Sequence, residues 1–332
     1  MTTPHKLQLA LNERSLRVVD EALRDSDRLG VAVLKVPGGG RVVDAGVTAS
    51  GGLEAGLLLA RACLAGLAEV SLEKAEPLSA GQVAPAGRIA SCPRVVVRTD
   101  HPVAACMASQ YAGWQISVGD FFAMGSGPMR AAYAKEELFA RVGFTERPER
   151  ALGVLETNAI PGPDVFQHLS EKLGIAPDRI SLLVASTKSL AGSLQVVARS
   201  VETALHKLLH LQFDLTRIQA GMGSAPLPPP AKDDIAALGR TNDAVLYGAH
   251  VTLWIRGDDV SIAAIGDRVP SSSSRDFGAP LSEVFERYGR DFYKVDPALF
   301  SPAQVTFQNL DTGRTQQFGR LAPDVLGRSF FG

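Results

Sequence analysis

The stretch "RISLLVASTKSLAGSLQVVARSVETALHKLL" (residues 179–209) joins an aliphatic run to a longer segment in which apolar residues recur every three or four positions. The run at 179–186 predicts a strand, and the periodicity predicts a long helix over 192–209. Further strands are predicted at residues 31–36, 41–47, 68–72, 94–100 and 151–157. Further helices are predicted at residues 9–28, 53–67, 101–114 and 162–174. This alternation is typical of an α/β or mixed α+β protein.

The last third of the chain follows a proline-rich connection, "APLPPPAKDD" (225–234). A short helix is predicted near 233–238 and another near 280–289. Strands are predicted at 251–257 and 260–266, and a hairpin at 304–318. The serine run at 269–274 is expected to be a mobile loop.

The composition describes a globular chain with no general attraction for polyanions. Of its 332 residues, 45% are hydrophobic and 21% are charged, which is enough apolar material for a sizeable core. The net charge of −1 gives no reason to expect a nucleic-acid or membrane partner. The N-terminus lacks the features of a signal peptide, and no uncharged apolar run reaches 18 residues, so a cytoplasmic protein is expected.

Cysteine and histidine patterns give little support to a metal site. The three cysteines have no CxxC spacing, which argues against a zinc knuckle or a disulfide framework. His206 and His210 lie four residues apart, but no acidic third ligand stands at a fixed spacing from them. We therefore expect no metal.

The segment 192–209 carries the first candidate for chemistry. On one continuous helix, Arg199 and Glu202 would lie about 60° apart, on the face opposite the leucines and valines. One interpretation is a solvated surface pair that contributes about 0.3 kcal/mol. The other is a site facing a cleft, in which the guanidinium orients the carboxylate and the carboxylate takes a proton from water.

A second candidate lies in "SQYAGWQISVGDFFAMGSGPMRAA" (109–132). Gly125, Ser126 and Gly127 precede a helix that starts after Pro128, and Arg130 adds a positive charge, so an anion site is one interpretation. A tight turn that needs glycine for backbone reasons is the other. The lysine of a P-loop is absent.

Three long motifs carry a resemblance to a known family: residues 99–131, 185–208 and 228–254. They read "TDHPVAACMASQYAGWQISVGDFFAMGSGPMRA", "ASTKSLAGSLQVVARSVETALHKL" and "PPPAKDDIAALGRTNDAVLYGAHVTLW". Together they resemble methenyltetrahydromethanopterin cyclohydrolases, more the bacterial, one-carbon-oxidising branch than the methanogen branch. The resemblance covers residues 8–325, so residues 1–332 are expected to form a single family unit.

The resemblance implies an α/β (mixed α+β) fold of two intertwined domains around a deep cleft, and a homotrimer. It implies hydrolysis of the 5,10-methenyl bridge of tetrahydromethanopterin or its dephospho form to the 5-formyl derivative, within formaldehyde oxidation. Neither metal nor cofactor is implied. Arg199 and Glu202 match the family's Arg and Glu, the glutamate being the catalytic carboxylate and the arginine tuning it.

Substrate contacts are a further expectation. The candidates are Gln110, Tyr111, Gly125, Ser126, Gly127, Arg130, Lys232 and Asp233. Tyr111 stands where archaeal members carry a lysine, so only stacking or hydrogen bonding is open to it. Asp233 could equally be a helix N-terminal charge. Two alternatives to a cyclohydrolase remain: a pterin-binding or regulatory protein without activity, and a phosphotransfer enzyme built on "AMGSGP".

Overall fold

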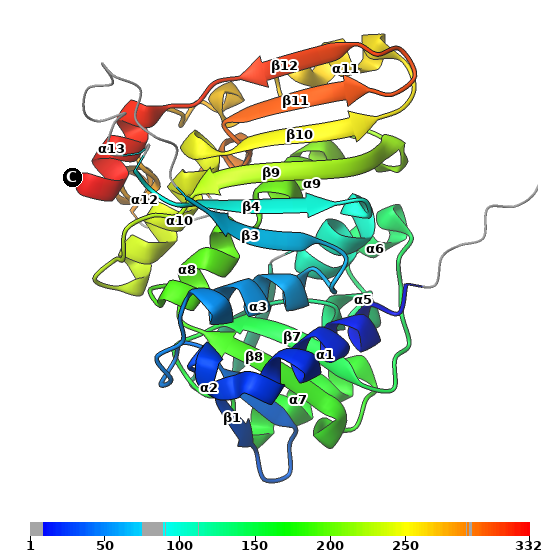
Figure 1. The fold of residues 1–332 in the computed structure, drawn as a ribbon, viewed down its shortest axis with the longest axis vertical. Coiled ribbons are helices and arrows are strands. Elements are labelled where there is room, and N and C mark those ends of the chain that lie inside the picture. Colours follow the sequence, from blue (N-terminus) through cyan, green and yellow to red (C-terminus); the bar gives the residue numbers. More distant parts are fainter. Residues whose placement is uncertain (1–8, 75–88, 90, 112, 290, 292–293) are drawn as a thin grey trace, which may run out of the picture.

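Two sheets, one above the other, organise the chain (Figure 1). The computed structural model describes residues 9–74, 89, 91–111, 113–289, 291 and 294–332. Within that part of the chain each sheet has six strands. Strands and helices mix in both halves, which confirms the predicted α/β (mixed α+β) class.

The lower sheet of Figure 1 contains the predicted strand before residues 192–209. Its order is β1 (Ala32–Lys35), β2 (Arg41–Asp44), β8 (Ile180–Ala185), β7 (Ala151–Glu156), β6 (Phe121–Ser126) and β5 (Trp114–Val118). β2, β8 and β7 run parallel, and the other neighbours are antiparallel. The carboxyl ends of the three parallel strands therefore meet at one edge, where ligand sites of α/β sheets tend to lie.

The upper sheet is built mostly from the C-terminal half. Its order is β12 (Thr315–Gly319), β11 (Gln304–Asn309), β10 (His250–Ile255), β9 (Ile218–Pro226), β4 (Arg94–Thr99) and β3 (Glu69–Glu73). Only β10 and β11 pair in parallel. The chain crosses from the lower to the upper sheet after β2, returns after β4 and crosses again after β8. The two sheets are therefore interleaved in sequence.

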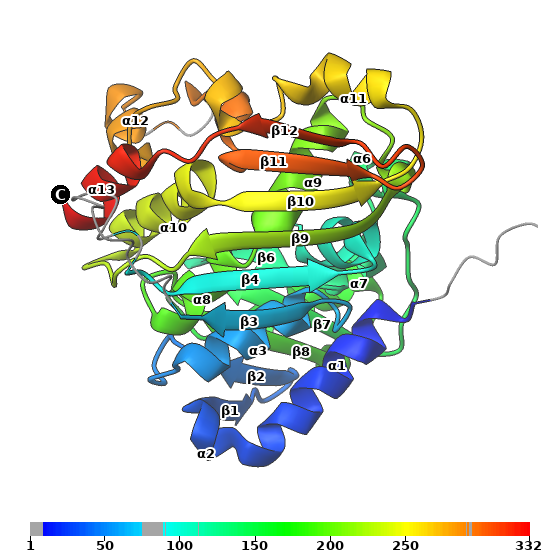
Figure 2. The ribbon, with the colours of Figure 1, turned by 45° about the horizontal axis from the view of Figure 1, so that its top comes forward.

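Helices lie between the two sheets and on both faces of the lower one, whereas no helix of the described residues covers the face of the upper sheet that is turned to the viewer (Figures 1 and 2). The α-helices are α1 (Leu11–Ala22), α2 (Ser26–Leu29), α3 (Leu53–Cys63), α5 (Met129–Tyr133), α6 (Glu137–Val142), α7 (Pro163–Leu173), α8 (Leu190–Val197), α9 (Ser200–His210), α10 (Asp234–Gly248), α11 (Asp259–Gly266), α12 (Leu281–Arg287) and α13 (Pro323–Phe331). α9 packs on β9 and β10, and α3 packs on α8. No helix of the described residues is long and apolar enough to cross a membrane.

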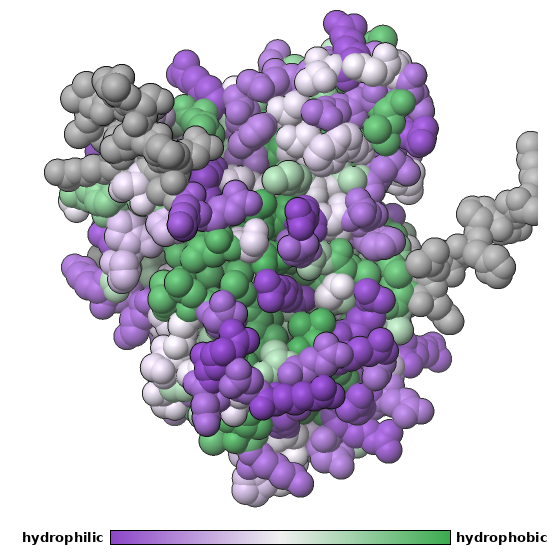
Figure 3. Space-filling view, viewed as in Figure 1, coloured by the Kyte–Doolittle hydropathy of each residue, from purple (hydrophilic) through white to green (hydrophobic). Residues whose placement is uncertain are grey.

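Alternation along the parallel strands explains why the lower sheet is covered on both sides. Val43 and Leu183 pack with α1 and α3, whereas their neighbours Val42 and Leu182 pack with α7. Successive side chains of a strand point to opposite faces, so a run of aliphatic residues requires helices on both. The outward face of α1 is hydrophilic, and apolar side chains gather beside it, over α3 and β3 (Figure 3).

Two predicted elements differ in kind. Residues 260–266 form α11 instead of a strand, because Asp258 accepts a hydrogen bond from the backbone N–H of Ser261 (2.7 Å) and so caps a helix. The predicted helix 101–114 is a π-helix, Val103–Gln110, and ends before Gly113, whose φ is +126°. Trp114 already belongs to β5.

Other predictions differ in extent. The helix expected near 233–238 continues to Gly248 as α10. The expectation of a mobile loop at 269–274 was wrong, because Ser271 is fully buried and its hydroxyl donates to the carbonyl of Leu246. A hydroxyl held by a buried carbonyl fixes that segment against α10.

A buried carboxyl group on α10 gives the first testable prediction. Asp243 is 1% exposed and accepts hydrogen bonds from the N–H of Leu281 (3.0 Å) and the hydroxyl of Ser329 (2.6 Å), which fastens α12 and α13 to α10. Burial raises the pKa of Asp243 to about 7, against the lowering effect of these hydrogen bonds. Between about pH 4 and 7 the folded protein keeps a proton that the unfolded chain releases, so stability falls as pH rises through that window.

Asp243→Asn removes this titration. We expect the free energy of unfolding, measured with urea at pH 5 and pH 7, to fall less between these values in Asp243→Asn than in the wild type. An identical pH dependence in the two proteins would contradict the assignment.

Candidate active site

The long helix predicted over 192–209 is broken in two at Arg199. α8 ends at Val197, α9 begins at Ser200, and Arg199 between them has φ −90° and ψ 8°. At the break another segment bonds the backbone: the side-chain amide of Gln110 donates to the carbonyl of Ala198 (3.1 Å). The carbonyl of Arg199 in turn accepts from the N–H and the hydroxyl of Thr203, both at 2.8 Å, and starts α9.

Arg199 and Glu202 are both buried, with 6% of each residue exposed. The solvated surface pair, one of the two interpretations of the sequence, is therefore wrong. The apolar face opposite them is as the periodicity predicts, because Leu194, Val201 and Leu205 are fully buried. The burial also means that each charge needs a partner or a neutral form.

Arg199 is held by groups from several segments of the chain. Nη1 donates to the carbonyl of Gln110 (2.6 Å), and Nη2 donates to Ser126 Oγ and to Gln195 Oε1, both at 3.1 Å. The ion-pair partner of Nη2 is Glu156 Oε1, 3.7 Å away at the end of β7. The ion pair expected between Arg199 and Glu202 is not formed, and Arg199 acts on Glu202 through its field alone.

Glu202 makes no hydrogen bond or ion pair with any residue that the structure describes. It lines a pocket instead. Burial raises the pKa of Glu202 to about 7, and the charges of Arg199 and Arg130 pull in the opposite direction. A carboxyl group with this pKa exists in both protonation states near neutral pH. It can therefore take a proton in one step and return it in another.

The pocket beside Glu202 has a volume of about 430 Å³ and takes its walls from both halves of the structure. Most of its lining is apolar, with a few polar groups on α9 and α10. The lining residues are Tyr111, Gly113, Met124, Val196, Arg199, Glu202, Thr203, His206, Thr241, Asn242, Val245, Leu246, Val295, Pro297 and Phe300. Apolar walls with few polar groups are typical of small-molecule sites.

Four of the predicted contacts, Gln110, Gly125, Ser126 and Gly127, are not among the residues that line the pocket. Gln110 and Ser126 bond Arg199 directly, and Ser126 also lies 3.3 Å from the Cys63 thiol. At Gly125 a Cβ atom would come within 2.9 Å of Ile116, and Gly127 has a φ of +88°. These two glycines are required by close packing and by the backbone.

The anion site predicted at residues 125–130 is filled by the protein itself. The N–H of Gly127 donates to Ser109 (2.9 Å), and that of Arg130 donates to Gly127 (3.1 Å). The Arg130 guanidinium is 1% exposed and bonds Glu136 and the carbonyl of Tyr111. The N–H groups of Gly127 and Arg130 and the Arg130 guanidinium are therefore already engaged within the protein, which argues against a phosphotransfer site there.

Lys232 and Asp233 stand apart from the pocket lining. Asp233 caps α10 by accepting from the N–H of Ala236 (2.8 Å), and Lys232 is exposed. Two residues that matter, Glu156 and Gln195, were not among the predicted contacts. A partial signal for Glu156 existed, because it stands at the carboxyl end of a predicted strand, and the parallel pairing of that strand with β8 places this end where such sheets have their sites.

Comparison with known proteins agrees with the resemblance seen in the sequence. Residues 10–330 match the family model described as Cyclohydrolase (MCH). The chain belongs to this family. It is 50% identical to the methenyltetrahydromethanopterin cyclohydrolase of Rhodopirellula baltica over 297 residues, 88% of this chain and 86% of the relative.

Two further relatives of the cyclohydrolase family carry the same name. The protein of Xanthobacter autotrophicus is 44% identical over 334 residues, 100% of this chain and 96% of the relative. The archaeal protein of Methanosarcina barkeri is 39% identical over 325 residues, 97% and 98% of the two chains. Bacterial and archaeal members thus match along almost their whole length.

Tyr111 lines the pocket of this cyclohydrolase-family chain and gives a second prediction. Its hydroxyl lies 3.3 Å from His206 Nε2, and the Arg130 guanidinium lies 4.5 Å above its ring. Tyr111→Phe keeps the ring, and Tyr111→Ala removes it. We expect Tyr111→Ala to weaken substrate binding about fivefold, measured as KM, because an aromatic contact contributes about 1 kcal/mol. Tyr111→Phe should change KM less than threefold, and unchanged KM in both variants would exclude Tyr111 as a contact.

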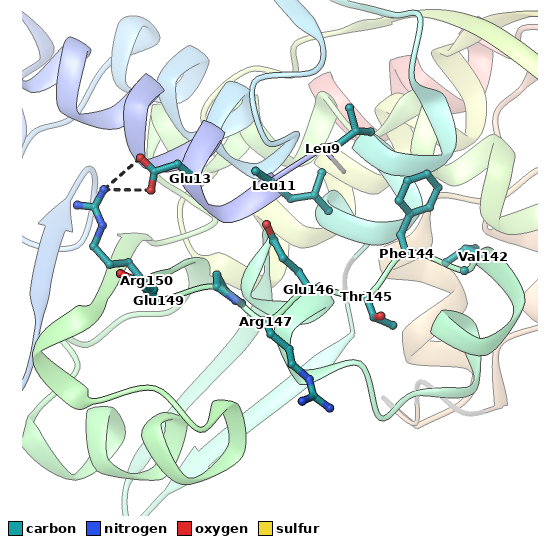
Figure 4. A pocket seen from close by; sticks show the side chains of 13 residues that line it. Leu9, Leu11, Glu13, Val142, Phe144, Thr145, Glu146, Arg147, Glu149 and Arg150 are labelled. Carbon is teal, nitrogen blue, oxygen red and sulfur yellow. Dashed lines mark hydrogen bonds and ion pairs between the residues drawn. The ribbon is translucent and has the colours of Figure 1, made fainter. Parts of the chain in front are cut away.

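A larger pocket, of about 1050 Å³, lies at the start of α1 (Figure 4). None of the predicted site residues lines it. Its acidic groups already have partners: Glu13 pairs with Arg150 (3.2 Å), and Glu146 accepts from the Asn12 amide (2.7 Å). The smaller pocket at Glu202 is therefore the better candidate for chemistry.

Proposed function

We propose that this protein is a methenyltetrahydromethanopterin cyclohydrolase in which Glu202 is the acid–base catalyst. One observation carries the proposal: Glu202 is a buried, unpaired carboxyl group with a pKa of about 7 on the wall of a mostly apolar pocket. Relatives at 50% and 44% identity bear that activity in their names, which supports the choice of substrate.

The amidinium carbon of the methenyl bridge is electrophilic without further activation. Water adds its oxygen to that carbon, and Glu202 accepts one proton of the water. The bond from the carbon to N10 then breaks, and Glu202 returns the proton to N10. The remaining hydroxyl proton leaves to solvent as the formyl C=O forms. One base of intermediate pKa serves both transfers.

Arg199 acts on the protonation of Glu202 from a fixed position. Its guanidinium is fixed to Gln110, Ser126 and Gln195, so its field on Glu202 has a fixed direction. That field opposes protonation of Glu202 and keeps a useful fraction ionised.

Decay of the methenyl carrier's near-ultraviolet absorbance with purified protein tests the proposal. Acceleration over buffer, with 5-formyl product identified by mass, supports it. Binding of the carrier without acceleration would overturn it in favour of a pterin-binding or regulatory protein.

We also propose a homotrimeric assembly, a cytoplasmic location, a role in formaldehyde oxidation, and activity without metal or cofactor. Sedimentation would give the mass of the assembly. Among the described residues no cluster of three His, Cys, Asp or Glu side chains is placed to hold a metal ion. Full activity after dialysis against a chelator is the expected result, and its loss would refute the metal-free mechanism.

A further inference from the structure

Around the Glu202 pocket, carboxyl groups outnumber guanidinium groups, and Glu202 is the one without a partner among the described residues. The relevant groups line the pocket, contact a residue that lines it, or form an ion pair with a group that does so. Arg199 pairs with Glu156, and Arg130, which stacks on Tyr111, pairs with Glu136. Glu202 has no partner among the residues that the structure describes. Two guanidinium groups and three carboxyl groups leave one net negative charge when Glu202 is ionised.

Other titratable groups near the pocket do not alter this balance at neutral pH. Burial lowers the pKa of His206 to about 4, so its imidazole is neutral. Lys207, on the same helix, donates to the carbonyl of Ala298 (2.9 Å) and has Asp296 as the nearby acid. The thiols of Cys63 and Cys106 are buried, and burial raises their pKa.

Glu156 is fixed in place by its own set of contacts. Its Oε1 accepts from the Gln195 amide (2.9 Å), and its Oε2 lies 3.5 Å from the hydroxyl of Thr187. Gln195 also accepts from Arg199, so it bridges the acid and the base. The β6–β7 register sets Glu156 opposite Met124, a residue of the pocket lining.

We propose that Glu156 determines the charge selectivity of the site by cancelling the charge of Arg199. This inference rests on the proposed function and names a residue that acts through Arg199. With Glu156 present, the pocket offers a net negative charge to a delocalised cation. Without it, Arg199 would neutralise Glu202, and a cationic ring would enter a site with no net attraction. The charge-neutral 5-formyl ring would not sense the change.

Glu156→Gln tests this, because it removes the charge and keeps the length of the side chain. We expect KM for the methenyl cation to rise about tenfold, the scale of one charge acting at short range in a partly shielded site. The inhibition constant of the 5-formyl product should change less than twofold. An equal rise in KM for the methenyl cation and in the inhibition constant of the 5-formyl product would mean a general loss of structure and overturn the proposal. An unchanged KM would also overturn it.

Two further variants complete the experiment. Glu156→Asp keeps the charge and should keep the preference for the cation, even where its turnover is reduced. Glu13→Gln, in the surface pair with Arg150, removes one carboxylate far from the pocket and should change neither constant. A tenfold rise in KM in Glu13→Gln would attribute the effect to overall charge and refute the role of Glu156.

Failure of the proposed function is recognised separately. If the wild type does not accelerate hydrolysis, equilibrium binding of the methenyl cation and of the 5-formyl form replaces kinetics. The dissociation constant of the methenyl cation divided by that of the 5-formyl form should still rise about tenfold in Glu156→Gln. A ratio equal to that of the wild type would overturn the inference about Glu156.

Discussion

Glu202→Gln is expected to lower kcat about 10³-fold, within the range for removal of a general acid–base group. The amide has nearly the shape of the carboxyl group but neither takes nor gives a proton at neutral pH. Binding should weaken at most about tenfold, because one charge facing the cation is lost while the pocket walls stay unchanged. Turnover of the methenyl carrier and its equilibrium binding are the two measurements. The variant Glu13→Gln, treated identically, should keep full activity.

A Glu202→Gln protein with near-normal kcat would remove this residue from the mechanism. A Glu202→Gln protein that neither binds nor hydrolyses the methenyl carrier would point to a damaged pocket, which near-ultraviolet circular dichroism would reveal. The pH dependence is a second check. The wild-type rate should respond to a group with a pKa of about 7, and that response should be absent from the residual rate of the variant.

Arg199→Met is expected to reduce both activity and stability. The change leaves the carboxylate of Glu156, largely buried, without its cation, and it removes donors from the Gln110 carbonyl and Ser126. Breaking such a pair from one side costs about 3–5 kcal/mol. Urea unfolding should show this loss in the free energy of unfolding, and kcat should fall at least about 10²-fold because Glu202 loses the field that keeps it ionised.

The double variant Arg199→Met with Glu156→Met separates the two effects. Removing both charges leaves no unpaired ion, so most of the lost stability should return, while kcat stays low. Arg199→Lys should recover little, because an ammonium group cannot reproduce the forked contacts to three acceptors. Stability of Arg199→Met equal to that of the wild type would contradict the importance of the pair.

Hydrophobic periodicity was enough to predict the elements that bury one face. Leu194, Val201 and Leu205 are buried as predicted, and the parallel strands β7 and β8 lie where their aliphatic runs are. The prediction of a strand at 260–266 was wrong, because Asp258 caps a helix there. An aspartate just before the segment is the sequence signal of such a helix start.

The break at Arg199 could not be predicted from its own segment. It is stabilised by the amide of Gln110, a residue 88 positions away in sequence, which bonds the carbonyl that the break exposes. Helical geometry alone sets Arg199 and Glu202 on a common outer face, whereas the partner that Arg199 takes is Glu156 on β7. Contacts between distant segments determine both the burial and the pairing, and neither has a local signal.

The interleaving of the two sheets bears on how the protein is made. β2 pairs with β8, and β4 pairs with β9. These early strands therefore cannot complete their pairing until the later strands have been made. On a chain leaving the ribosome, β4 lacks its neighbour β9 until residue 226 has been synthesised and released. Unpaired strand edges are the surfaces on which newly made chains associate wrongly. The two sheets are therefore completed late in translation, and a chain truncated before residue 226 would leave this edge of β4 unpaired.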